Sequence, residues 1–317
     1  MADVVEVAEA AGVRVAWSDL PASVRAGVEA VLGSPVVEAV TQPGGFSPGS
    51  ADRVRTADGG RAFVKAVSAT ANPRSPGLHR QEAAVTVALP RTAPVPTLLG
   101  VHDDGTWVAL VLADVDGRHP ALPWRTDELE AVRRAYEEVA TVPLTGALAA
   151  LPGTGEQLAE DFAGWRRLLA EPDADLDPWA AAHLHRLAAT AARAAGVVVG
   201  DQLVHGDARA DNLLVRPDGT VAVVDWPWAS RGAGWFDLVC VLVNVACYDA
   251  EAPVEALVAD WLPDVPAEDV DAVLAGLAGY FVDVARRPDP PGLPTVRAFQ
   301  RAQGGAVLAW LRQRWGA

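Results

Sequence analysis

The chain has 317 residues, of which 50% are hydrophobic, so it can bury a sizeable core, and intrinsic disorder is excluded as its main state. Its 26 lysines and arginines stand against 41 aspartates and glutamates, which gives a formal net charge of −15 at pH 7. Because nucleic acids and anionic membranes bind basic surfaces, neither is expected as a partner.

Residues 1–40 are predicted to be helical, because apolar side chains recur at helical spacing through Val24, Val28 and Val31. A turn-rich segment, Pro43–Gly49, follows. Apolar and β-branched runs then predict two β-hairpins with Asp/Gly turns, formed by residues 51–56 with 62–67 and by residues 97–102 with 106–112. A helix over residues 78–89 is expected between them. The first third is therefore predicted to be a small antiparallel sheet with one main helix.

The composition changes after the Asp/Gly-rich segment 113–117. Residues 126–200, and those from Asp237 to the end, are rich in helix-forming residues interrupted by prolines. Within this region, residues 212–215 and 221–225 predict a third hairpin. We therefore expect an α+β chain in three parts: an N-terminal lobe at 1–112, a hinge at 113–117 and a mostly helical lobe at 118–317.

The sequence carries no membrane or secretion signal. Its apolar runs are shorter than the roughly 20 residues that span a bilayer, and its N-terminus lacks the charged-then-apolar pattern of a secretory signal. A cytoplasmic protein is expected.

The strongest signal for chemistry is His205-Gly206-Asp207 followed by Asn212, with Asp225 at the end of the next apolar run. This H-x-D-x-x-x-x-N spacing suits phosphoryl transfer. One carboxylate orients and deprotonates an attacking hydroxyl, while an amide and a second carboxylate hold Mg²⁺ on the nucleotide phosphates. The alternative is that these aspartates only form turns.

Lys65 is the single lysine in the chain, and it lies in an apolar run where a charged side chain needs a reason. Glu82, on the predicted helix, can hold it, and a lysine held in this way can bind nucleotide phosphates as a compact point charge. Taken alone, Glu82 would be read as a solvated surface residue.

The Pro43–Gly49 segment offers further phosphate contacts. Its glycines allow backbone N–H groups to approach phosphate oxygens, and the Ser47 hydroxyl is an extra donor. By itself such a run is more often a turn. It matches neither the G-x-x-x-x-G-K-[ST] loop nor the G-x-G-x-x-G dinucleotide loop, so both of those folds lose support.

Together these motifs resemble the aminoglycoside phosphotransferase family, whose members share a two-lobed protein-kinase-like fold and phosphorylate small alcohols. The resemblance extends from about Gly44 to about Asn244. It is carried by Gly45-Phe46-Ser47-Pro48-Gly49, Lys65, Glu82, His205-Gly206-Asp207, Asn212, Asp225-Trp226 and Phe236-Asp237-Leu238. Eukaryotic protein kinases have an arginine where Gly206 stands and a longer activation segment than the 11 residues from Asp225 to Phe236, so a protein substrate is not expected.

The resemblance implies a nucleotide site, with ATP as the default phosphate donor and GTP still open. Its residues would be Ser47, Gly49, Lys65, Glu82, Ala113 and Val115. In that site the glycine loop covers the phosphates, the lysine binds them and the glutamate positions the lysine. The hinge offers backbone groups to the adenine.

It also implies the catalytic residues. Asp207 is the base or the group that orients the hydroxyl, and Asn212 and Asp225 hold Mg²⁺. Asp237 braces the catalytic loop through backbone hydrogen bonds. Arg209 either neutralises the transferring phosphoryl group or is a surface arginine.

We therefore predict a Mg²⁺-dependent phosphotransferase that moves the γ-phosphate of ATP or GTP to a hydroxyl of a small molecule, with an aminoglycoside or related amino sugar as leading acceptor. Kinases of a sugar, homoserine or a choline-like amine remain alternatives, and a non-catalytic nucleotide-binding module is a less favoured one.

A cationic acceptor is favoured by the distribution of charge. The net charge is −2 over residues 1–113 and −13 over residues 114–317, where kinases of this resemblance bind the acceptor. Candidate acidic residues are Glu156, Glu160, Asp161, Asp249, Glu251 and Glu255. The alternative is that this charge serves only solubility.

Overall fold

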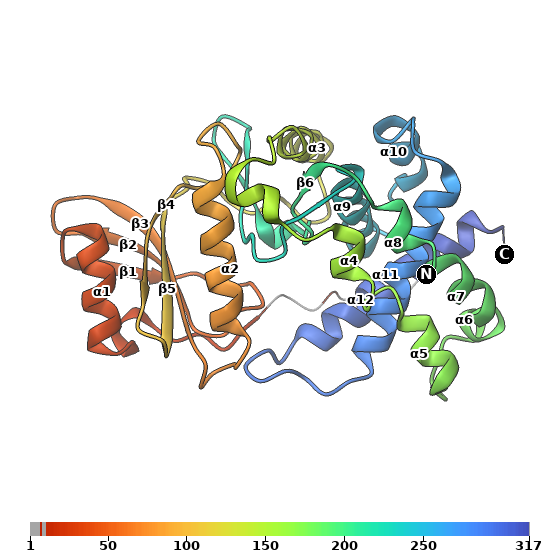
Figure 1. The fold of residues 1–317 in the computed structure, drawn as a ribbon, viewed down its shortest axis with the longest axis horizontal. Coiled ribbons are helices and arrows are strands. Elements are labelled where there is room, and N and C mark those ends of the chain that lie inside the picture. The colour runs from red at the N-terminus through yellow and green to blue at the C-terminus, as the bar shows by residue number, and fades with distance from the viewer. Residues whose placement is uncertain (1–6, 8–10, 317) are drawn as a thin grey trace.

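The computed structural model describes residue 7 and residues 11–316, and these form two lobes side by side (Figure 1). The N-terminal lobe is built on a five-stranded antiparallel sheet with strand order β1-β2-β3-β5-β4. Its strands are β1 (Val36–Thr41), β2 (Ser50–Thr56), β3 (Arg61–Ser68), β4 (Leu98–Asp103) and β5 (Trp107–Ala113).

Both hairpins predicted for this lobe are present. β2 and β3 are joined by the turn at residues 57–60, and β4 and β5 by the turn at residues 104–106. Gly59 and Gly105 have φ angles of 91° and 89°, a left-handed conformation that glycine adopts without a steric penalty. The predicted helix is α2 (Ser75–Ala88), which lies between the hairpins in the chain.

The prediction of helix across residues 1–40 is wrong for much of that range. Among the described residues, helix is confined to the short 3₁₀ turn η1 (Trp17–Asp19) and α1 (Ala22–Leu32), and β1 follows as a strand. Gly33 ends α1 with a φ of 73°, and its N–H donates to the Glu29 carbonyl at 2.8 Å. Three of the six residues of β1 are valine, and pairing with β2 stabilises them as a strand. Residues 1–6 and 8–10 lie outside the described residues.

The two faces of the sheet are covered by different helices (Figure 1). On one face, Val24 and Val28 of α1 pack with Val64 and Val111 of the sheet. On the other, Ala83 of α2 packs with Leu110. Because side chains alternate along a strand, Lys65 points away from the α1 face that holds its neighbour Val64. This alternation directs the lysine towards α2 and the second lobe.

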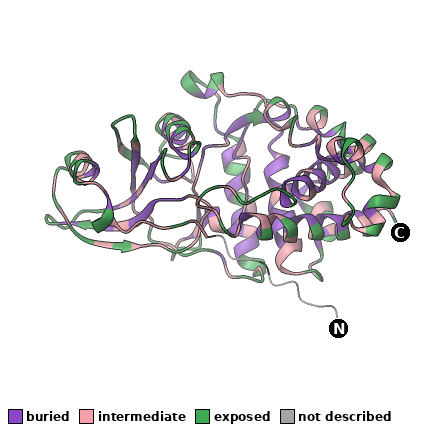
Figure 2. Ribbon diagram, turned by 90° about the horizontal axis from the view of Figure 1, so that it is seen from below, coloured by how far each residue is buried: buried purple, intermediate pink, exposed green. Residues whose placement is uncertain are grey.

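The C-terminal lobe is mostly helical, as predicted. Its helices are α3 (Thr126–Ala140), α4 (Thr154–Leu158), α5 (Gly164–Ala170), α6 (Pro178–Ala182), α7 (Leu184–Ala191), α8 (Ala194–Val197), α9 (Trp235–Tyr248), α10 (Val254–Trp261), α11 (Ala267–Ala285) and α12 (Val296–Arg314), with 3₁₀ turns η2 (Gly146–Ala150) and η3 (Ala210–Asn212). In Figure 2 the buried residues concentrate along the central helices of this lobe. Trp165 of α5 is fully buried there, and its indole N–H donates to the Ala275 carbonyl of α11 at 2.7 Å. None of the helices in the described part of the chain is both long and apolar enough to cross a membrane.

Two short strand pairs frame the loops that matter for the site. The predicted third hairpin is present as β7 (Leu213–Val215) and β8 (Val221–Val223). A second pair, β6 (Gln202–Val204) with β9 (Ser230–Gly232), was not predicted. Each of its strands is three residues long, too short for a periodic signal, and they are stabilised by pairing with each other and, for β9, by the bridge from Arg231 to Gly153. The pair brings the start and the end of the segment 202–232 together.

Candidate active site

Lys65 connects the two lobes at the centre of the site. Its Nζ atom, on β3, lies 2.5 Å from Oε2 of Glu82 on α2. The same atom donates to Oδ1 of Asp225, just after β8 in the helical lobe, at 2.6 Å. The side chains of Lys65 and Glu82 are 11% and 3% exposed, whereas that of Asp225 is 35% exposed. Lys65 is thus held from behind by a buried glutamate and faces a carboxylate that is open to solvent.

The charges of these three groups depend on one another. Burial alone would lower the pKa of Lys65, but the carboxylates of Asp225 and Glu82 outweigh it and hold that pKa above its ordinary value. Burial opposes ionisation of Asp225, yet the Lys65 ammonium keeps the Asp225 pKa below its ordinary range. Burial raises the pKa of Glu82 to about 7, against the attraction of Lys65. Lys65 and Asp225 therefore form the charged pair at neutral pH.

The catalytic loop that follows β6 holds a second charged cluster. Nη1 of Arg209 donates to both carboxylate oxygens of Asp207, at 2.6 and 2.7 Å. Nε and Nη2 of the same guanidinium each donate to Asp211 at 2.9 Å. Nδ2 of Asn212 donates to Oδ2 of Asp207 at 2.9 Å and to its carbonyl at 2.8 Å. The Arg209 side chain is only 15% exposed, so it is not a free surface arginine.

Asp207 is ionised less readily than an ordinary aspartate. Burial raises its pKa to about 6, and the nearby charges of Asp211 and Asp225 act in the same direction. The Arg209 guanidinium and the Asn212 amide act against the increase. A carboxylate with a pKa close to neutral can accept a proton more readily than one near 4.

The backbone of the catalytic loop is fixed from below. Asp237, in the first turn of α9, is 1% exposed, and its two oxygens accept the N–H groups of His205 and Gly206 at 2.7 and 2.9 Å. Gly206 has a φ of 81°, and a Cβ atom there would lie 2.8 Å from the Trp228 carbonyl. The loop therefore needs glycine at this position, both for the turn and for the close approach.

His205 connects the loop after β6 to the residues that follow β8. Its ring is fully buried against Trp226, edge to face with 4.8 Å between ring centroids. Nε2 faces the carbonyls of Val224 and Asp225, at 3.0 and 2.9 Å, and therefore donates to them. Asp225 itself has a φ of 69°, which is strained for a residue with a side chain. The contact from His205 helps to hold that conformation.

Asn212 and Asp225 have the chemistry of magnesium ligands. Oδ1 of Asn212 and Oδ2 of Asp225 have no hydrogen-bond partner among the described residues. Mg²⁺ prefers oxygen ligands and is commonly held by one or two protein groups together with substrate phosphates. No cluster of three or more His, Cys, Asp or Glu side chains suited to a metal occurs in residues 11–316.

The glycine loop, Pro43–Gly49, connects β1 to β2. The backbone N–H groups of Gly44, Gly45, Phe46 and Ser47 have no hydrogen-bond partner within the described chain. Gly44 and Gly45 both have positive φ angles, 88° and 77°. Consecutive free N–H groups in a glycine-rich turn form a concave site for an anion such as phosphate.

The N–H groups of Ala113 and Val115 at the expected hinge differ in their partners. The N–H of Ala113 is already donated to the Thr97 carbonyl at 2.8 Å. The N–H of Val115 has no partner among the described residues, so it is the available donor for an adenine edge. Asp114 between them accepts two hydrogen bonds from Arg53, at 2.7 and 2.8 Å.

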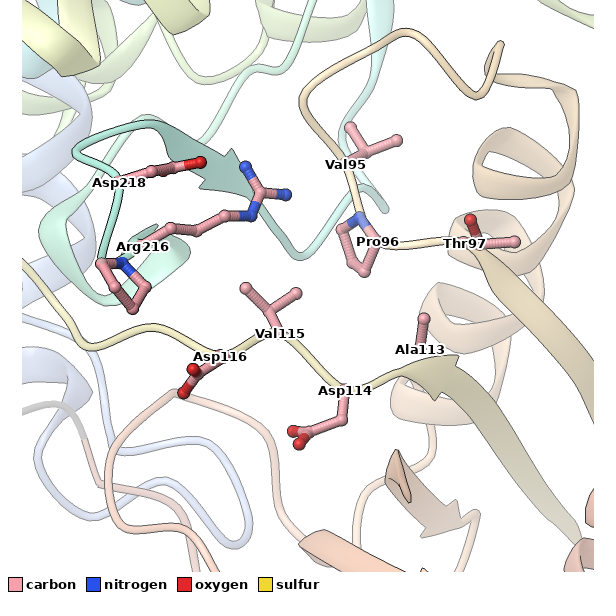
Figure 3. A pocket seen from close by; sticks show the side chains of 10 residues that line it. Val95, Pro96, Thr97, Ala113, Asp114, Val115, Asp116, Arg216 and Asp218 are labelled. Carbon is pink, nitrogen blue, oxygen red and sulfur yellow. The ribbon is translucent and has the colours of Figure 1, made fainter. Parts of the chain in front are cut away.

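A pocket of about 500 Å³ runs along this hinge (Figure 3). It is bounded by residues 113–116, by residues 95–97 and by the turn between β7 and β8. Lys65, Asp207 and Asp225 do not line it. The pocket therefore borders the hinge and is distinct from the site where the charged residues meet.

The acidic residues considered for an acceptor differ in their surroundings. Glu255 accepts two hydrogen bonds from Arg314, at 2.8 and 2.9 Å, so it serves the packing of α10 on α12. Asp161 is half-buried, and its carboxylate has no ion pair or hydrogen bond among the described residues; burial raises its pKa. Burial, with the charges of Asp161 and Asp207, raises the pKa of Tyr280 to about 12. The charges of Asp161 and Asp207 thus both act on Tyr280.

Two charged residues of the site are not indicated by the sequence analysis. Asp211 is given no role there, although its position two residues after Arg209 is a signal that could have indicated the pairing. Arg14 donates to the Ser47 carbonyl at 2.5 Å and also to the Gly44 carbonyl. Nothing in the local sequence around Arg14 signals this contact.

Comparisons with known proteins identify the family and the fold. The model of the phosphotransferase enzyme family matches residues 45–273, which is well over half of the chain. No curated protein matches. The chain is 14% identical to the apo form of a thermostable mutant of aminoglycoside phosphotransferase APH(4)-Ia, with a TM-score of 0.63 over 93% of this chain and 100% of that one.

Two further solved structures show the same fold. A ternary complex of a thermostable APH(4)-Ia mutant with AMP-PNP and hygromycin B has a TM-score of 0.62 at 14% identity, covering 94% of this chain and 100% of that one. The choline kinase LicA from Streptococcus pneumoniae has a TM-score of 0.60 at 14% identity, covering 90% and 98%. The predicted two-lobed, protein-kinase-like fold is confirmed. The chain belongs to the phosphotransferase enzyme family and is a small-molecule kinase.

Proposed function

We propose that this kinase transfers the γ-phosphate of ATP or GTP to a hydroxyl of an amino sugar such as an aminoglycoside. The observation that carries the phosphoryl-transfer assignment is the Lys65–Asp225 ion pair of 2.6 Å, which joins the sheet lobe to the loop beside Asp207 and Asn212. In the proposed reaction Lys65 is the phosphate-binding cation, the unpaired oxygens of Asn212 and Asp225 are the metal ligands, and Asp207 is the base, which is the set of groups that phosphoryl transfer needs.

Each residue has a distinct role in the proposed reaction. Asp207 accepts a hydrogen bond from the acceptor hydroxyl and takes its proton as the oxygen attacks the γ-phosphorus, whose bond to the β–γ bridging oxygen breaks and releases the nucleoside diphosphate. Lys65 binds the phosphates and offsets their charge, and Glu82 fixes its position. Mg²⁺, held by Asn212 and Asp225, would further neutralise the phosphate oxygens. The hinge at 113–117 binds adenine through the Val115 N–H.

Arg209 is proposed to act on the base as well as on the phosphoryl group. Its guanidinium contacts both oxygens of Asp207. It therefore lowers the Asp207 pKa against the effect of burial and keeps a fraction of the carboxylate ionised near neutral pH. Because the guanidinium is already next to the base, it can also approach the transferring phosphoryl group without a large movement.

The proposal of a cationic acceptor rests on Asp161. It is a half-buried carboxylate without a partner in the described chain. Its charge and the charge of Asp207 both act on Tyr280. An acceptor ammonium bound there would lie on the acceptor side of the base. A choline-like amine would satisfy the same carboxylate, and the fold shared with choline kinase LicA keeps that acceptor as the second candidate.

The test is a phosphate-transfer assay with ATP and GTP over a panel of alcohols. The panel should contain hygromycin B, other aminoglycosides, choline, homoserine and neutral sugars, and mass spectrometry should detect a product heavier by one phosphoryl group. The proposal predicts transfer to an aminoglycoside and, on expression in a sensitive host, resistance to that antibiotic. Transfer only to neutral or anionic alcohols would contradict the amino-sugar assignment. Nucleotide binding without transfer to any acceptor would support the non-catalytic alternative.

A further inference from the structure

Residues 11–15, termed here the N-terminal strap, run between the glycine loop and the helical lobe. The Gly49 N–H donates to the Val13 carbonyl at 2.9 Å, and the Val15 N–H donates back to the Gly49 carbonyl at 3.0 Å. On its other side, the Val13 N–H donates to the Gly292 carbonyl at 2.9 Å. Gly292 lies in the connection between α11 and α12, which reaches to the edge of the sheet lobe in Figure 1. The strap thus ties the glycine loop to the second lobe.

The packing between these segments is tight. A Cβ atom on Gly12 would lie 2.4 Å from the Ser47 carbonyl oxygen, so only glycine allows the strap to lie this close to the loop. At the loop tip, Phe46 packs on Phe299 of α12 with 5.1 Å between ring centroids, and the Arg209 guanidinium lies 5.3 Å from the Phe46 ring centre. The loop is therefore closed onto the catalytic loop and α12.

Arg14 fixes the peptide groups of the loop. Its Nη1 donates to the Ser47 carbonyl at 2.5 Å and its Nη2 donates to the Gly44 carbonyl. An arginine fork is suited to holding two acceptors at once, which a single ammonium group is not. In a planar trans peptide the carbonyl and the following N–H point in opposite directions. Holding the Gly44 carbonyl therefore turns the Gly45 N–H away from the guanidinium, where it stays free for a phosphate.

We propose that Arg14 is a positioning residue of the nucleotide site: it holds the glycine loop closed and its N–H groups free, and the strap transmits that closure from the helical lobe. This inference rests on the proposed use of a nucleotide as phosphate donor. It adds to that function a residue that precedes Gly44 by 30 positions and lies outside the residues matched by the family model.

The experiment compares full-length variants for binding of Mg²⁺·AMP-PNP by calorimetry and for their kinetic constants. Arg14→Met removes the donors while it keeps an unbranched side chain, and Arg14→Lys keeps the charge but not the fork. Arg25→Met is the matched control, because Arg25 also donates to a backbone carbonyl of the sheet lobe, that of Ser18, but away from the loop. Thermal unfolding of each variant shows whether it is folded.

For Arg14→Met we expect the dissociation constant of Mg²⁺·AMP-PNP to rise about tenfold, equivalent to about 1.4 kcal/mol. Arg14→Lys should lie between wild type and Arg14→Met, and Arg25→Met should match the wild type. The KM for the acceptor should be unchanged in all three. A role in stability alone would lower the melting temperature without this selective loss of nucleotide affinity.

Gly12→Ala is a second variant. Its Cβ would push the strap away from Ser47, while the Arg14 side chain itself is not substituted. Its control is Gly305→Ala, since no neighbouring atom lies within 4 Å of a Cβ there. Gly12→Ala should also weaken nucleotide binding selectively, and Gly305→Ala should not.

Unchanged or tighter nucleotide binding in folded Arg14→Met overturns the inference, and tighter binding would show that Arg14 obstructs the site. Unchanged binding in Gly12→Ala overturns the role of the strap. If the wild type binds neither AMP-PNP nor a GTP analogue, the proposed function fails, and this inference fails with it. The two failures are distinguishable. If the proposed function fails, the wild type binds no nucleotide; if only this inference fails, the wild type and Arg14→Met bind nucleotide equally well.

Discussion

The catalytic loop and the glycine loop both contribute to the active site, but their polar groups are satisfied in opposite ways. In the catalytic loop Asp207, Arg209, Asp211 and Asn212 bind one another, and Asp237 fixes the backbone beneath them. In the glycine loop four N–H groups have no partner among the described residues, while its carbonyls are held by Arg14 from a distant segment.

This difference indicates how the two loops would respond to substrate. The catalytic loop is organised before substrate arrives, so its residues need little reordering during the reaction. The glycine loop presents donors whose partners come with the nucleotide, and its conformation depends on contacts from outside the loop. We therefore expect changes in the catalytic loop to reduce kcat, and changes around the glycine loop to reduce nucleotide affinity.

The largest effect should come from the base. Asp207→Asn should lower kcat by about a thousandfold, because general-base removal typically costs roughly 10²–10⁴ in rate. Its affinity for Mg²⁺·AMP-PNP should be nearly unchanged, because the role of Asp207 is on the acceptor hydroxyl. Steady-state kinetics and calorimetry measure the two quantities, and Asp260→Asn, at an exposed position of α10, is the control.

Asp225→Ala distinguishes the proposed metal ligand from the proposed base. It removes a proposed magnesium ligand and the partner of Lys65 together, so it should weaken Mg²⁺·nucleotide binding as well as turnover. The assignment of roles would be reversed if Asp207→Asn lost nucleotide affinity while Asp225→Ala retained it.

Lys65 tests whether the sheet lobe binds phosphate through a point charge. Lys65→Met should lower kcat/KM for the nucleotide about a hundredfold, in the range found when a group that stabilises transition-state charge is removed. Lys65→Arg should also be impaired, because the planar fork differs from an ammonium in shape and reach. Near-normal kcat/KM for the nucleotide in Lys65→Met would contradict the assignment of this lobe.

The pH dependence tests the arrangement of the catalytic loop. Asp207 must be ionised to accept a proton, and burial raises its pKa to about 6. The kcat/KM for the acceptor should therefore fall as the pH drops through about 6. Arg209→Gln removes the guanidinium that lowers this pKa, so the fall should move to higher pH. An unshifted profile in Arg209→Gln would show that the observed group is not Asp207.

The smallest expected effect concerns the acceptor. Asp161→Asn should raise the KM for an aminoglycoside about threefold with little change in kcat, as expected for a partly screened ion pair. The wild-type kcat/KM for that acceptor should fall between roughly 0.05 and 0.5 M salt, because the Debye length shortens over that range. Glu255→Gln is the control, since Glu255 is bound to Arg314. Equal effects of the two variants, or no salt dependence, would remove the support for a cationic acceptor.

The parts of the site that could be predicted are those set by short stretches of chain. Asp207 and Asn212 are five residues apart on one loop, so their contact follows from local geometry. The Asp/Gly turns determine both hairpins of the sheet lobe, because glycine allows the positive φ that they need. The single lysine in an apolar strand indicated a functional charge. The sequence by itself thus determined the family, the fold class and the candidate reaction.

Tertiary structure decided the contacts between distant segments. β1 is a strand because it pairs with β2, and the β6–β9 pair exists only because residues 202 and 232 are brought together. The separation of 30 residues between Arg14 and Gly44 conceals the contact that holds the glycine loop. Glu255 and Asp161 look alike in the sequence, but one is neutralised by Arg314 and the other is left without a partner among the described residues. Residue type determines which side chains can carry a charge, whereas the burial that shifts their pKa values and the partners that satisfy or expose them are determined by the packing of the whole chain.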